Sequence, residues 1–392
     1  LSGWLQNMLQ RHGAKALTDS LFFYGTLRHK PLLEIVLGHK ADGIAIQDAV
    51  LNDYGVHRVA EGPFPTLIAK QGARADGLVV TGLTAQDIAR LDFYEGGFDY
   101  DLVEVVLESG TMAQVYICAP DRWEQQGPWD FEDWCARWGE MSCHAAVEVM
   151  GHYGSLTRDQ VAAHFPQIRG RAWSRVLGGQ THAGQAVRAG EIEIIAQRRA
   201  YTGYFAVNEV DLRHSRFDGT WSPELARSYF IAGDAALVLP YDPVRDCVLV
   251  VEQMRMGPLG RGDSEVWHLE PVAGRIDPGE TAEEAALREA QEEAGLDIQR
   301  LEIVARGYPS PGDSTGYFHI FVGLADLPEK IAGLGGLATE HEDIRSRLIP
   351  LDEFIAMAER QALANTPLTL LAYWLAHHRS RLRSESGEDT PV

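Results

Sequence analysis

Hydrophobic and polar positions in the second half of the chain alternate as they do in β-strands, with turn residues between the runs. Residues 191–233 contain three such runs, and Asp218 and Gly219 form one of the turns. Residues 234–256 contain two more strands on either side of the turn DPVRD. After three further strands, a helix is predicted from Thr366 with apolar residues on one side. The pattern indicates a mixed α and β fold.

One helix interrupts these strands, within the segment GRIDPGETAEEAALREAQEEAGL at residues 274–296. Thr281 is predicted to cap its N-terminus, and Glu284 lies three residues later, where it completes a capping box. Gly295 is predicted to end the helix in the left-handed conformation that glycine adopts at low cost.

Three glutamates on this helix, Glu289, Glu292 and Glu293, follow the i, i+3, i+4 spacing and therefore share one face. Like charges this close repel one another, so a cation is expected among them. Oxygen ligands favour a hard divalent ion, with Mg²⁺ the first choice and Mn²⁺ also possible. The alternative interpretation is an acidic helix face that is simply solvated.

The first half of the chain begins with an apolar strand, Leu21 to Tyr24, which leads into Gly25 and a short helix. A glycine turn after a strand exposes backbone N–H groups that can bind a carboxylate. Further strands and a hairpin follow up to residue 120. Residues 121–189 are predicted to form a helical extension and a linker, and the many tryptophans of the extension are expected to pack against the first domain.

Composition limits the possible functions. The chain has 392 residues, 45% of them hydrophobic and 23% charged, as expected for a soluble protein of two or three domains. A net charge of −21 argues against binding to nucleic acid or to an acidic membrane. The four cysteines show no metal-ligand spacing and no disulfide pattern, and we expect a cytoplasmic protein.

The acidic helix carries a longer pattern, Gly-x5-Glu-x7-Arg-Glu-x-x-Glu-Glu-x-Gly. Its fixed positions are Gly274, Glu280, Arg288, Glu289, Glu292, Glu293 and Gly295. This pattern resembles the Nudix box. The strings LPYDPVRD, EQMR, VAG, SPG and EHEDI extend the resemblance, over residues 191–383, to the ADP-ribose pyrophosphatase group. The resemblance implies a Nudix α/β/α sandwich, preceded by a small antiparallel β-subdomain, that uses Mg²⁺ to hydrolyse ADP-ribose to AMP and ribose 5-phosphate.

The resemblance also implies a role for individual residues. The metal ligands would be the Ala273 carbonyl, Glu289, Glu292, Glu293 and Glu342. Glu340 would be the general base, with the neighbouring His341 as an alternative. Arg227 and Arg255 would bind phosphate or ribose, and Tyr204 would stack on adenine. In this group the strands before the box pair with a second subunit, which implies a homodimer.

A second resemblance covers roughly residues 20–120. The motifs YGTLR and LDFYEG resemble the gamma-glutamylcyclotransferase-like (AIG2-like) family, a small β-barrel with flanking helices. The resemblance implies that Tyr24, Gly25, Thr26 and Leu27 hold a glutamyl carboxylate, and that Glu95 moves protons during cyclisation. Burial of Glu95 would raise its pKa toward neutrality, where a carboxyl serves best as acid or base. The alternative is a module that only binds or packs.

We therefore expect a cyclotransferase-like domain at residues 18–120, a helical extension and linker at residues 121–189, and a Nudix hydrolase domain at residues 190–384. Alternatives to ADP-ribose hydrolysis are a bifunctional enzyme, action on another nucleoside-diphosphate sugar, and a Nudix domain retained for binding. The loop after SPG departs from the group's usual glutamate, since Gly316 and Tyr317 lie there, so the nucleotide preference stays open. The domain combination also resembles proteins associated with tellurite resistance, which implies a setting and no mechanism.

Overall fold

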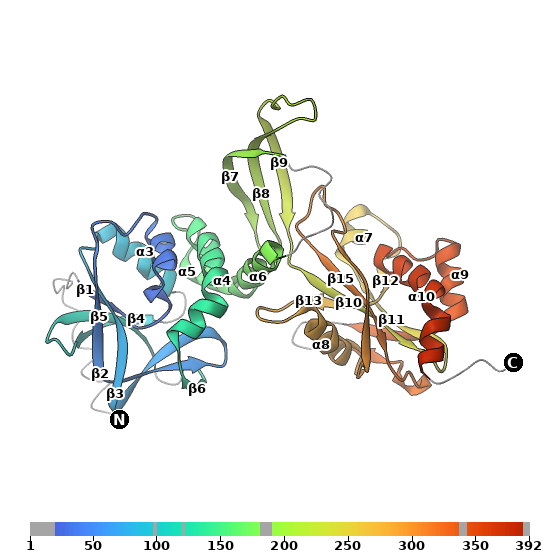
Figure 1. Cartoon of the computed structure of the whole chain (residues 1–392), viewed down its shortest axis with the longest axis horizontal. Coiled ribbons are helices and arrows are strands. Elements are labelled where there is room, and N and C mark those ends of the chain that lie inside the picture. The colour runs from blue at the N-terminus through green and yellow to red at the C-terminus, as the bar shows by residue number, and fades with distance from the viewer. Residues whose placement is uncertain (1–19, 97–99, 120–121, 181–189, 337–342, 387–392) are drawn as a thin grey trace. The chain divides into compact units, whose positions relative to one another are not determined.

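The computed structural model describes residues 20–96, 100–119, 122–180, 190–336 and 343–386. The chain divides into two compact units between Ala172 and Trp173 (Figure 1), and each is described by itself. The predicted linker lies largely in residues 181–189, outside the described residues. The narrower domain limits inferred from the sequence stay predictions.

The first unit is built on a six-stranded sheet in the order β4-β5-β1-β3-β2-β6. Its strands are β1 (Ser20–Phe23), β2 (Ala45–Val59), β3 (Gly62–Thr81), β4 (Tyr100–Val106), β5 (Met112–Cys118) and β6 (Gln125–Pro128). The sequence predicted a β-barrel here. Among the described residues no pairing joins the edge strands β4 and β6, as a closed barrel would require, so the observed sheet is open.

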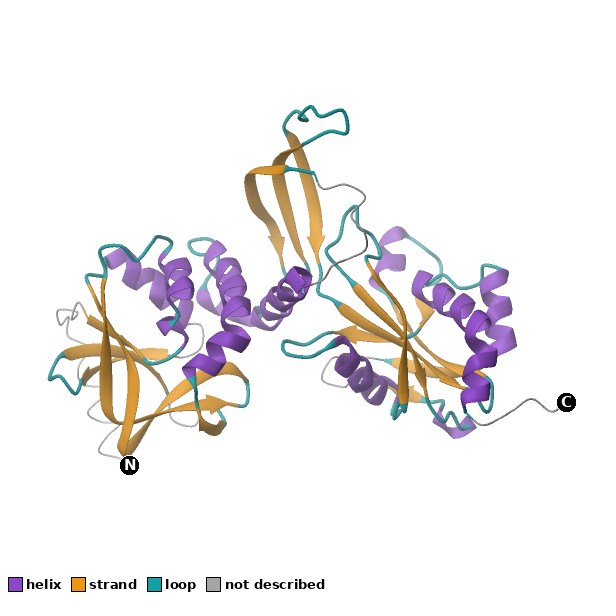
Figure 2. Cartoon of the chain, viewed as in Figure 1, coloured by secondary structure: helices purple, strands orange, loops and turns teal. Residues whose placement is uncertain are grey.

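Helices pack beside this sheet (Figure 2). They are the 3₁₀ turn η1 (Thr26–Arg28), α2 (Lys30–Leu37), α3 (Ala85–Gly96), α4 (Phe131–Gly151), α5 (Arg158–Ala163) and α6 (Phe165–Gln180), and the boundary between the two units falls within α6. Trp134 of α4 is 2% exposed, and its Nε1 donates to the Pro63 carbonyl at 2.5 Å. The ring of Trp123 meets Phe64 edge to face, with centroids 5.0 Å apart. Trp123 and Trp134 therefore pack on the first sheet as predicted, whereas Trp173 belongs to the second unit and packs against the core of that unit.

The second unit begins with a separate antiparallel sheet of three strands, β7 (Ile192–Thr202), β8 (Ala206–His214) and β9 (Leu225–Ile231). Gly219, with φ 85°, makes the predicted turn between β8 and β9, and the Asp218 carboxylate accepts from the Thr220 N–H at 2.9 Å. This sheet confirms the predicted β-subdomain ahead of the Nudix segment.

An eight-stranded mixed sheet forms the body of the second unit. Its strands are β10 (Ala235–Asp242), β11 (Cys247–Met254), β12 (Trp267–Glu270), β13 (Val272–Arg275), β14 (Arg300–Gly307), β15 (Phe318–Leu324), β16 (Leu334–Gly335) and β17 (Ile344–Pro350). The main path runs β14-β15-β10-β11-β17-β16, with β12 paired to β11 and β13 to β10. The helices are α7 (Met256–Arg261), α8 (Ala282–Ala294), the 3₁₀ turn η2 (Glu329–Ile331), α9 (Leu351–Glu359) and α10 (Thr366–Glu385).

Alternation along β10 shows how this sheet becomes the middle layer of a sandwich. Leu237 and Leu239 belong to a core cluster shared with α9 and α10, whereas Ala236 and Val238 belong to a cluster shared with α8. Successive residues of a strand point to opposite faces, so both faces are covered (Figure 2). The predicted α/β/α sandwich is confirmed. The last helix is capped by Asn365, one residue before the predicted start.

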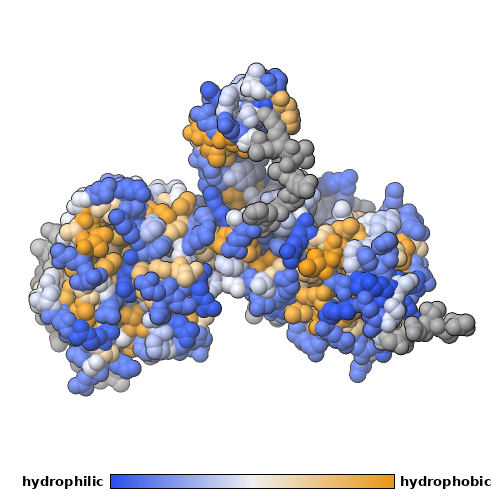
Figure 3. Space-filling view, viewed as in Figure 1, coloured by the Kyte–Doolittle hydropathy of each residue, from blue (hydrophilic) through white to orange (hydrophobic). Residues whose placement is uncertain are grey.

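The surface mixes polar and hydrophobic residues over the face shown in Figure 3. No helix within the described ranges is both long enough and apolar enough to cross a membrane.

Candidate functional sites

Local hydrogen bonds place helix α8 where the sequence predicted it. The Thr281 hydroxyl accepts from the Glu284 N–H at 3.1 Å, and the Glu284 carboxylate accepts from the Thr281 N–H at 2.8 Å. Gly295 ends the helix with φ 62°. The capping box and the glycine cap fix both ends, so the direction in which each glutamate leaves the helix is set by its position.

Arg288 lies among the acidic residues of this helix. Its Nη1 donates to Glu289 at 2.7 Å and to Glu292 at 3.0 Å. Its Nε and Nη2 bind Glu280 at 2.7 and 2.9 Å, and Nη2 also donates to the Arg275 carbonyl at 3.0 Å. These bonds raise the pKa of Arg288 above its ordinary value. Burial raises the pKa of Glu280, but the hydrogen bonds from Arg288 and the Asp277 N–H lower the pKa by more than burial raises it. The pKa of Glu280 is therefore below its ordinary value.

Strand β13 and helix α8 fit together through a glycine. A Cβ added at Gly274 would overlap the carboxylate of Glu289, so only glycine leaves room for that side chain. Glu293, 3% exposed, accepts a hydrogen bond from the Ala273 N–H at 3.3 Å. Two of the three predicted metal-binding glutamates therefore lie directly against the VAG segment.

The residues present suit a hard divalent ion. Three carboxylates lie within about one turn of α8, and the lack of a side chain at Gly274 leaves room for one of them, Glu289. Within the described ranges, no three His, Cys, Asp or Glu side chains are already grouped in a geometry that would hold an ion. The predicted base Glu340, its alternative His341 and the predicted ligand Glu342 lie outside the described residues.

The predicted substrate residues of this unit lie on three different elements. Tyr204, between β7 and β8, is 60% exposed, and the Arg275 guanidinium stacks 4.3 Å from its ring centroid. Arg255 follows β11 and donates to Glu270 at 2.8 and 2.5 Å. Arg227 lies exposed on β9. Sequence reasoning missed Arg275, although it directly follows Gly274 in the motif, because the pattern leaves its identity open.

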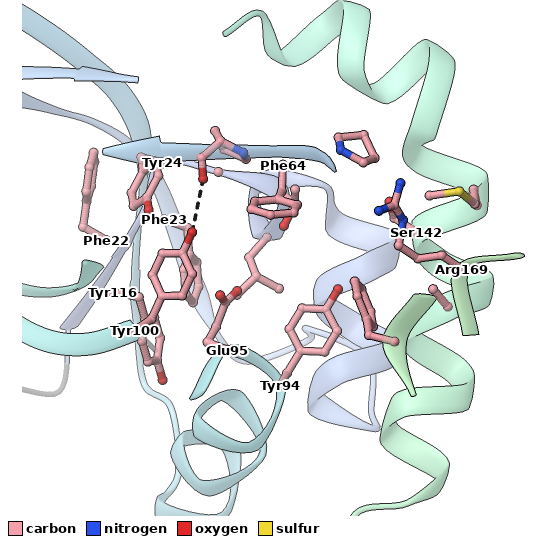
Figure 4. A pocket seen from close by; sticks show the side chains of 18 residues that line it. Phe22, Phe23, Tyr24, Phe64, Tyr94, Glu95, Tyr100, Tyr116, Ser142 and Arg169 are labelled. Carbon is pink, nitrogen blue, oxygen red and sulfur yellow. Dashed lines mark hydrogen bonds between the residues drawn. The ribbon is translucent and has the colours of Figure 1, made fainter. Parts of the chain in front are cut away.

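The first unit contains a cavity of about 100 Å³ (Figure 4). Residues from β1 and the turn after it, η1, β3, α3, β4, β5, α4 and α6 line it: Phe22, Phe23, Tyr24, Gly25, Thr26, Leu27, Pro63, Phe64, Pro65, Tyr94, Glu95, Tyr100, Tyr116, Met141, Ser142, Ala145, Phe165 and Arg169. Every site residue predicted for this unit is in this set. The walls are mainly aromatic, and the polar groups are few, which is typical of a small-molecule site.

The turn after β1 is held by close packing. A Cβ at Gly25 would lie 3.1 Å from the Pro65 ring, and Tyr24 is 6% exposed. The Tyr100 hydroxyl donates to the Pro65 carbonyl at 3.4 Å, the bond dashed in Figure 4. This packing places the backbone of the turn along the cavity wall.

Glu95 projects into this cavity from the end of α3, near Tyr94 and Tyr100 (Figure 4). Burial among aromatic rings raises its pKa from the ordinary 4.5 to about 7. Burial, reinforced by the nearby Glu95 carboxylate, raises the pKa of Tyr94 as well. Glu95 can therefore both accept and release a proton near neutral pH, as the sequence predicted if this residue was buried.

Helices α4 and α6 provide a wall that sequence reasoning missed. Met141, Ser142 and Ala145 come from α4, and Phe165 and Arg169 from α6. No motif marked these residues, since they lie 40 or more positions after Glu95 and only the tertiary fold brings them to the cavity.

Glu95→Gln is expected to stabilise the first unit at pH about 8 and to leave its stability nearly unchanged at pH about 4. The folded-state pKa of about 7 exceeds the ordinary 4.5, so the folded protein binds the proton more tightly. Stability is then lost as pH rises from 4.5 through 7. At about 1.4 kcal/mol per pKa unit, the gain at high pH is about 3 kcal/mol.

Denaturant unfolding of both proteins across this pH range measures the effect. Glu104→Gln, a change at an exposed glutamate on β4, is the matched control and should alter the profile little. Parallel profiles for the wild type and Glu95→Gln would show that Glu95 ionises as an ordinary surface carboxyl.

Comparisons with known proteins agree with this division of the chain. Residues 232–370 match the family model described as NUDIX domain. Residues 21–136 match the one described as Gamma-glutamyl cyclotransferase, AIG2-like.

Similar proteins align with the second half of the chain. The ADP-ribose pyrophosphatase of Escherichia coli (strain K12) is 37% identical over 195 residues, which cover 50% of this chain and 92% of that protein. The ADP-ribose pyrophosphatase of Haemophilus influenzae is 33% identical over 183 residues, 46% of this chain and 82% of that protein. The GDP-mannose pyrophosphatase of Yersinia enterocolitica is 30% identical over 161 residues, 41% of this chain and 83% of that protein.

A solved structure described as the crystal structure of ADP compounds hydrolase covers 50% of this chain and 98% of its own, with 22% identity and a TM-score of 0.38. The Nudix box on α8, the sandwich around it and a relative that aligns over nine-tenths of its length at 37% identity agree with one another. The chain is thus a member of the Nudix hydrolase family, with an AIG2-like cyclotransferase domain ahead of its Nudix domain.

Proposed function

We propose that the Nudix domain hydrolyses the diphosphate of ADP-ribose to AMP and ribose 5-phosphate with the help of Mg²⁺. The observation that carries this proposal is the set of three carboxylates on α8, of which Glu289 lies against the bare backbone of Gly274 and Glu293 against Ala273 in β13. The choice of ADP-ribose as substrate is supported by the relatives named ADP-ribose pyrophosphatase, which align over most of their length. In the reaction, the oxygen of water bonds to one phosphorus as the bridging P–O bond breaks.

Nudix hydrolases generally use divalent metal ions, and here Glu289, Glu292, Glu293, the Ala273 carbonyl and Glu342 would hold them. When bound, such ions neutralise the diphosphate and lower the pKa of water. Mn²⁺ would serve in the same way as Mg²⁺.

Two other side chains would hold the carboxylates in position and transfer a proton. Arg288 holds Glu289 and Glu292 in place through its charged hydrogen bonds. Glu340 would take the proton from the attacking water, and the same proton equivalent leaves with the products at neutral pH.

Substrate recognition would use residues around β13 and β11. Tyr204 presents an exposed ring, stacked with Arg275, on which adenine can lie. Arg255, at the end of β11, would bind phosphate, and Arg227 the terminal ribose. A GDP-mannose pyrophosphatase at 30% identity makes other nucleoside-diphosphate sugars the alternative substrates.

A second activity is proposed for the cavity of the first unit, because an acid with a pKa near 7 faces the Tyr24–Leu27 turn there. The ligand would be a γ-glutamyl compound. Its α-amine attacks the γ-carbonyl carbon, a C–N bond forms to give 5-oxoproline, and the original amide C–N bond breaks. Glu95 takes the proton from the attacking amine and returns it to the departing amine, so no water or cofactor is consumed.

We also propose that the protein is a homodimer joined through the β7–β9 sheet. All but two residues of β7 are exposed, including Ile192 at 67%, Ile194 at 61% and Tyr201 at 60%. An edge strand with this many exposed apolar side chains favours pairing with another chain. A second copy would cover these residues, and it would lie close to Tyr204 at the β7–β8 turn.

Turnover of ADP-ribose is expected to require Mg²⁺ and to depend on Glu293. Glu293→Gln removes one charge at nearly constant volume from the buried carboxylate beside Ala273. We expect the Mg²⁺ concentration for half-maximal rate to rise about tenfold or more, with partial recovery at high Mg²⁺. Release of AMP, followed over a Mg²⁺ titration, measures this.

Glu283→Gln is the matched control, because Glu283 lies on the same helix but pairs with the partly exposed Arg306. Its Mg²⁺ dependence should equal that of the wild type. Full turnover in EDTA would contradict the role of the metal, and turnover of GDP-mannose in place of ADP-ribose would contradict the substrate.

Glu95→Gln is expected to abolish formation of 5-oxoproline from γ-glutamyl compounds while ADP-ribose hydrolysis continues at the wild-type rate. The change removes the only carboxyl among the described residues that line the cavity. Chromatographic detection of 5-oxoproline and of AMP in the same samples measures both activities. Parallel loss of the two activities would contradict separate sites.

The homodimer is tested by Ile194→Lys, which places a positive charge among the exposed apolar residues of β7. The wild type is expected to sediment at twice the chain mass and the variant at one chain mass, with lower ADP-ribose turnover. Val106→Lys, at a residue 59% exposed on β4, is the matched control and should remain dimeric. A monomeric wild type would refute the proposed interface.

A further inference from the structure

Two helices that lie mostly outside the matched cyclotransferase segment complete the cavity of the first unit. The match to the family model ends at Ala136, the sixth residue of α4. Beyond that point, α4 contributes Met141, Ser142 and Ala145, and α6 contributes Phe165 and Arg169. This wall therefore lies outside the matched segment, and its side chains can change which ligands the cavity accepts.

Arg169 brings a positive charge to this wall. Of the described residues that line the cavity, it is the one with a permanent positive charge, as Glu95 is the one with a carboxyl group. Its Nη1 lies 3.1 Å from the position that a Cβ would take at Gly62, next to Pro63 and Phe64 of the cavity wall. The absence of a side chain at Gly62 gives the guanidinium room beside β3.

The arrangement in the cavity separates the two charged groups. Figure 4 shows Glu95 near Tyr100 on the side of the sheet, and Arg169 on the side of α4 and α6. The Tyr24–Leu27 turn and Glu95 are assigned above to the glutamyl half of a ligand. Arg169 therefore faces the part of the cavity that remains for the other half, the amine that departs.

Electrostatics favour an anion at this end. A guanidinium stays charged at all working pH values and binds a carboxylate through two parallel hydrogen bonds. Below neutral pH the buried Glu95 is largely protonated, so the described lining then carries a net positive charge. Aromatic walls keep bulk water away, and charge pairs are stronger there than on the surface.

We propose that Arg169 binds a carboxylate on the amine half of the ligand, so that the cavity selects γ-glutamyl amino acids over γ-glutamyl alkylamines. This inference rests on the cyclisation proposed above and deepens it by naming the leaving group. Arg169 touches no reacting atom in this scheme, and its effect is on substrate selection.

Two compounds that differ in one carboxylate test the proposal. γ-Glutamyl-alanine and γ-glutamyl-ethylamide share the glutamyl half and the amide, but only the first has a carboxylate on the amine half. The full chain is expected to bind the first roughly tenfold to a hundredfold more tightly by calorimetry, and to show the same preference in kcat/KM for 5-oxoproline release. Arg169→Gln should remove this preference and leave affinity for the ethylamide unchanged.

Three further measurements keep the test decisive. Arg169→Lys should retain part of the preference, because it keeps the charge and loses the paired hydrogen bonds. Arg58→Gln, at an exposed arginine of β2 that donates to the Gln126 carbonyl, is the matched control and should retain all of it. Thermal unfolding of each variant checks the fold. If Arg169→Gln does not fold, the wild-type preference and its reduction in Arg169→Lys decide the question.

The outcomes separate this inference from the activity beneath it. If the wild type cyclises both compounds equally, or if Arg169→Gln keeps the preference, the proposed activity stands and the role of Arg169 is refuted. If the wild type neither binds nor cyclises either compound, both are refuted.

Discussion

The crowding of negative charge on α8 is the constraint on which the Nudix site depends. Glu289, Glu292 and Glu293 lie within one turn and a half of helix, and like charges at that spacing repel. Arg288 relieves part of this repulsion, because it binds two of them and Glu280 at once. The same guanidinium ties α8 to the Arg275 carbonyl of β13. The motif therefore encodes a helix together with its attachment to the sheet.

The pKa of a partly buried carboxyl group is shifted in opposite directions in the two units. Arg288 lies beside Glu280 and, with the Asp277 N–H, holds the pKa of Glu280 below its ordinary value despite burial, so its carboxylate stays ionised. Glu95 lies among aromatic rings, and burial raises its pKa to about 7. The ionised Glu280 can hold the Arg288 guanidinium in place, whereas a carboxyl group that titrates near neutral pH suits proton transfer. The neighbours of each glutamate, rather than its own chemistry, decide which role it can take.

The sequence was most informative where the structure is local. The capping box at Thr281, the glycine cap at Gly295 and the shared face of the three glutamates depend on residues within a few positions of one another, and all were predicted. The α/β/α sandwich was expected from the resemblance to the Nudix family, and in the structure apolar residues on both faces of β10 pack against helices. By contrast, closure of the first sheet depends on pairing between β4 and β6, which no local pattern reveals, and the predicted barrel is open. Arg169 was missed for the same reason, because its place in the cavity follows from the packing of α6.

The exposed β7–β9 sheet connects the proposed assembly with the proposed chemistry. Exposure of apolar side chains such as Ile192 and Ile194 to water is unfavourable. Covering them would stabilise the sheet by about 25 cal/mol per Å² of buried apolar area. The turn at the end of β7 carries Tyr204, whose ring stacks on Arg275. Arg275 in turn follows Gly274, the residue that admits Glu289. Burial of β7 against a second chain would therefore restrict the motion of Tyr204 and, through Arg275, bear on the segment that holds the carboxylates. In the proposed dimer, the interface and the proposed catalytic site would therefore form one connected structure within the second unit.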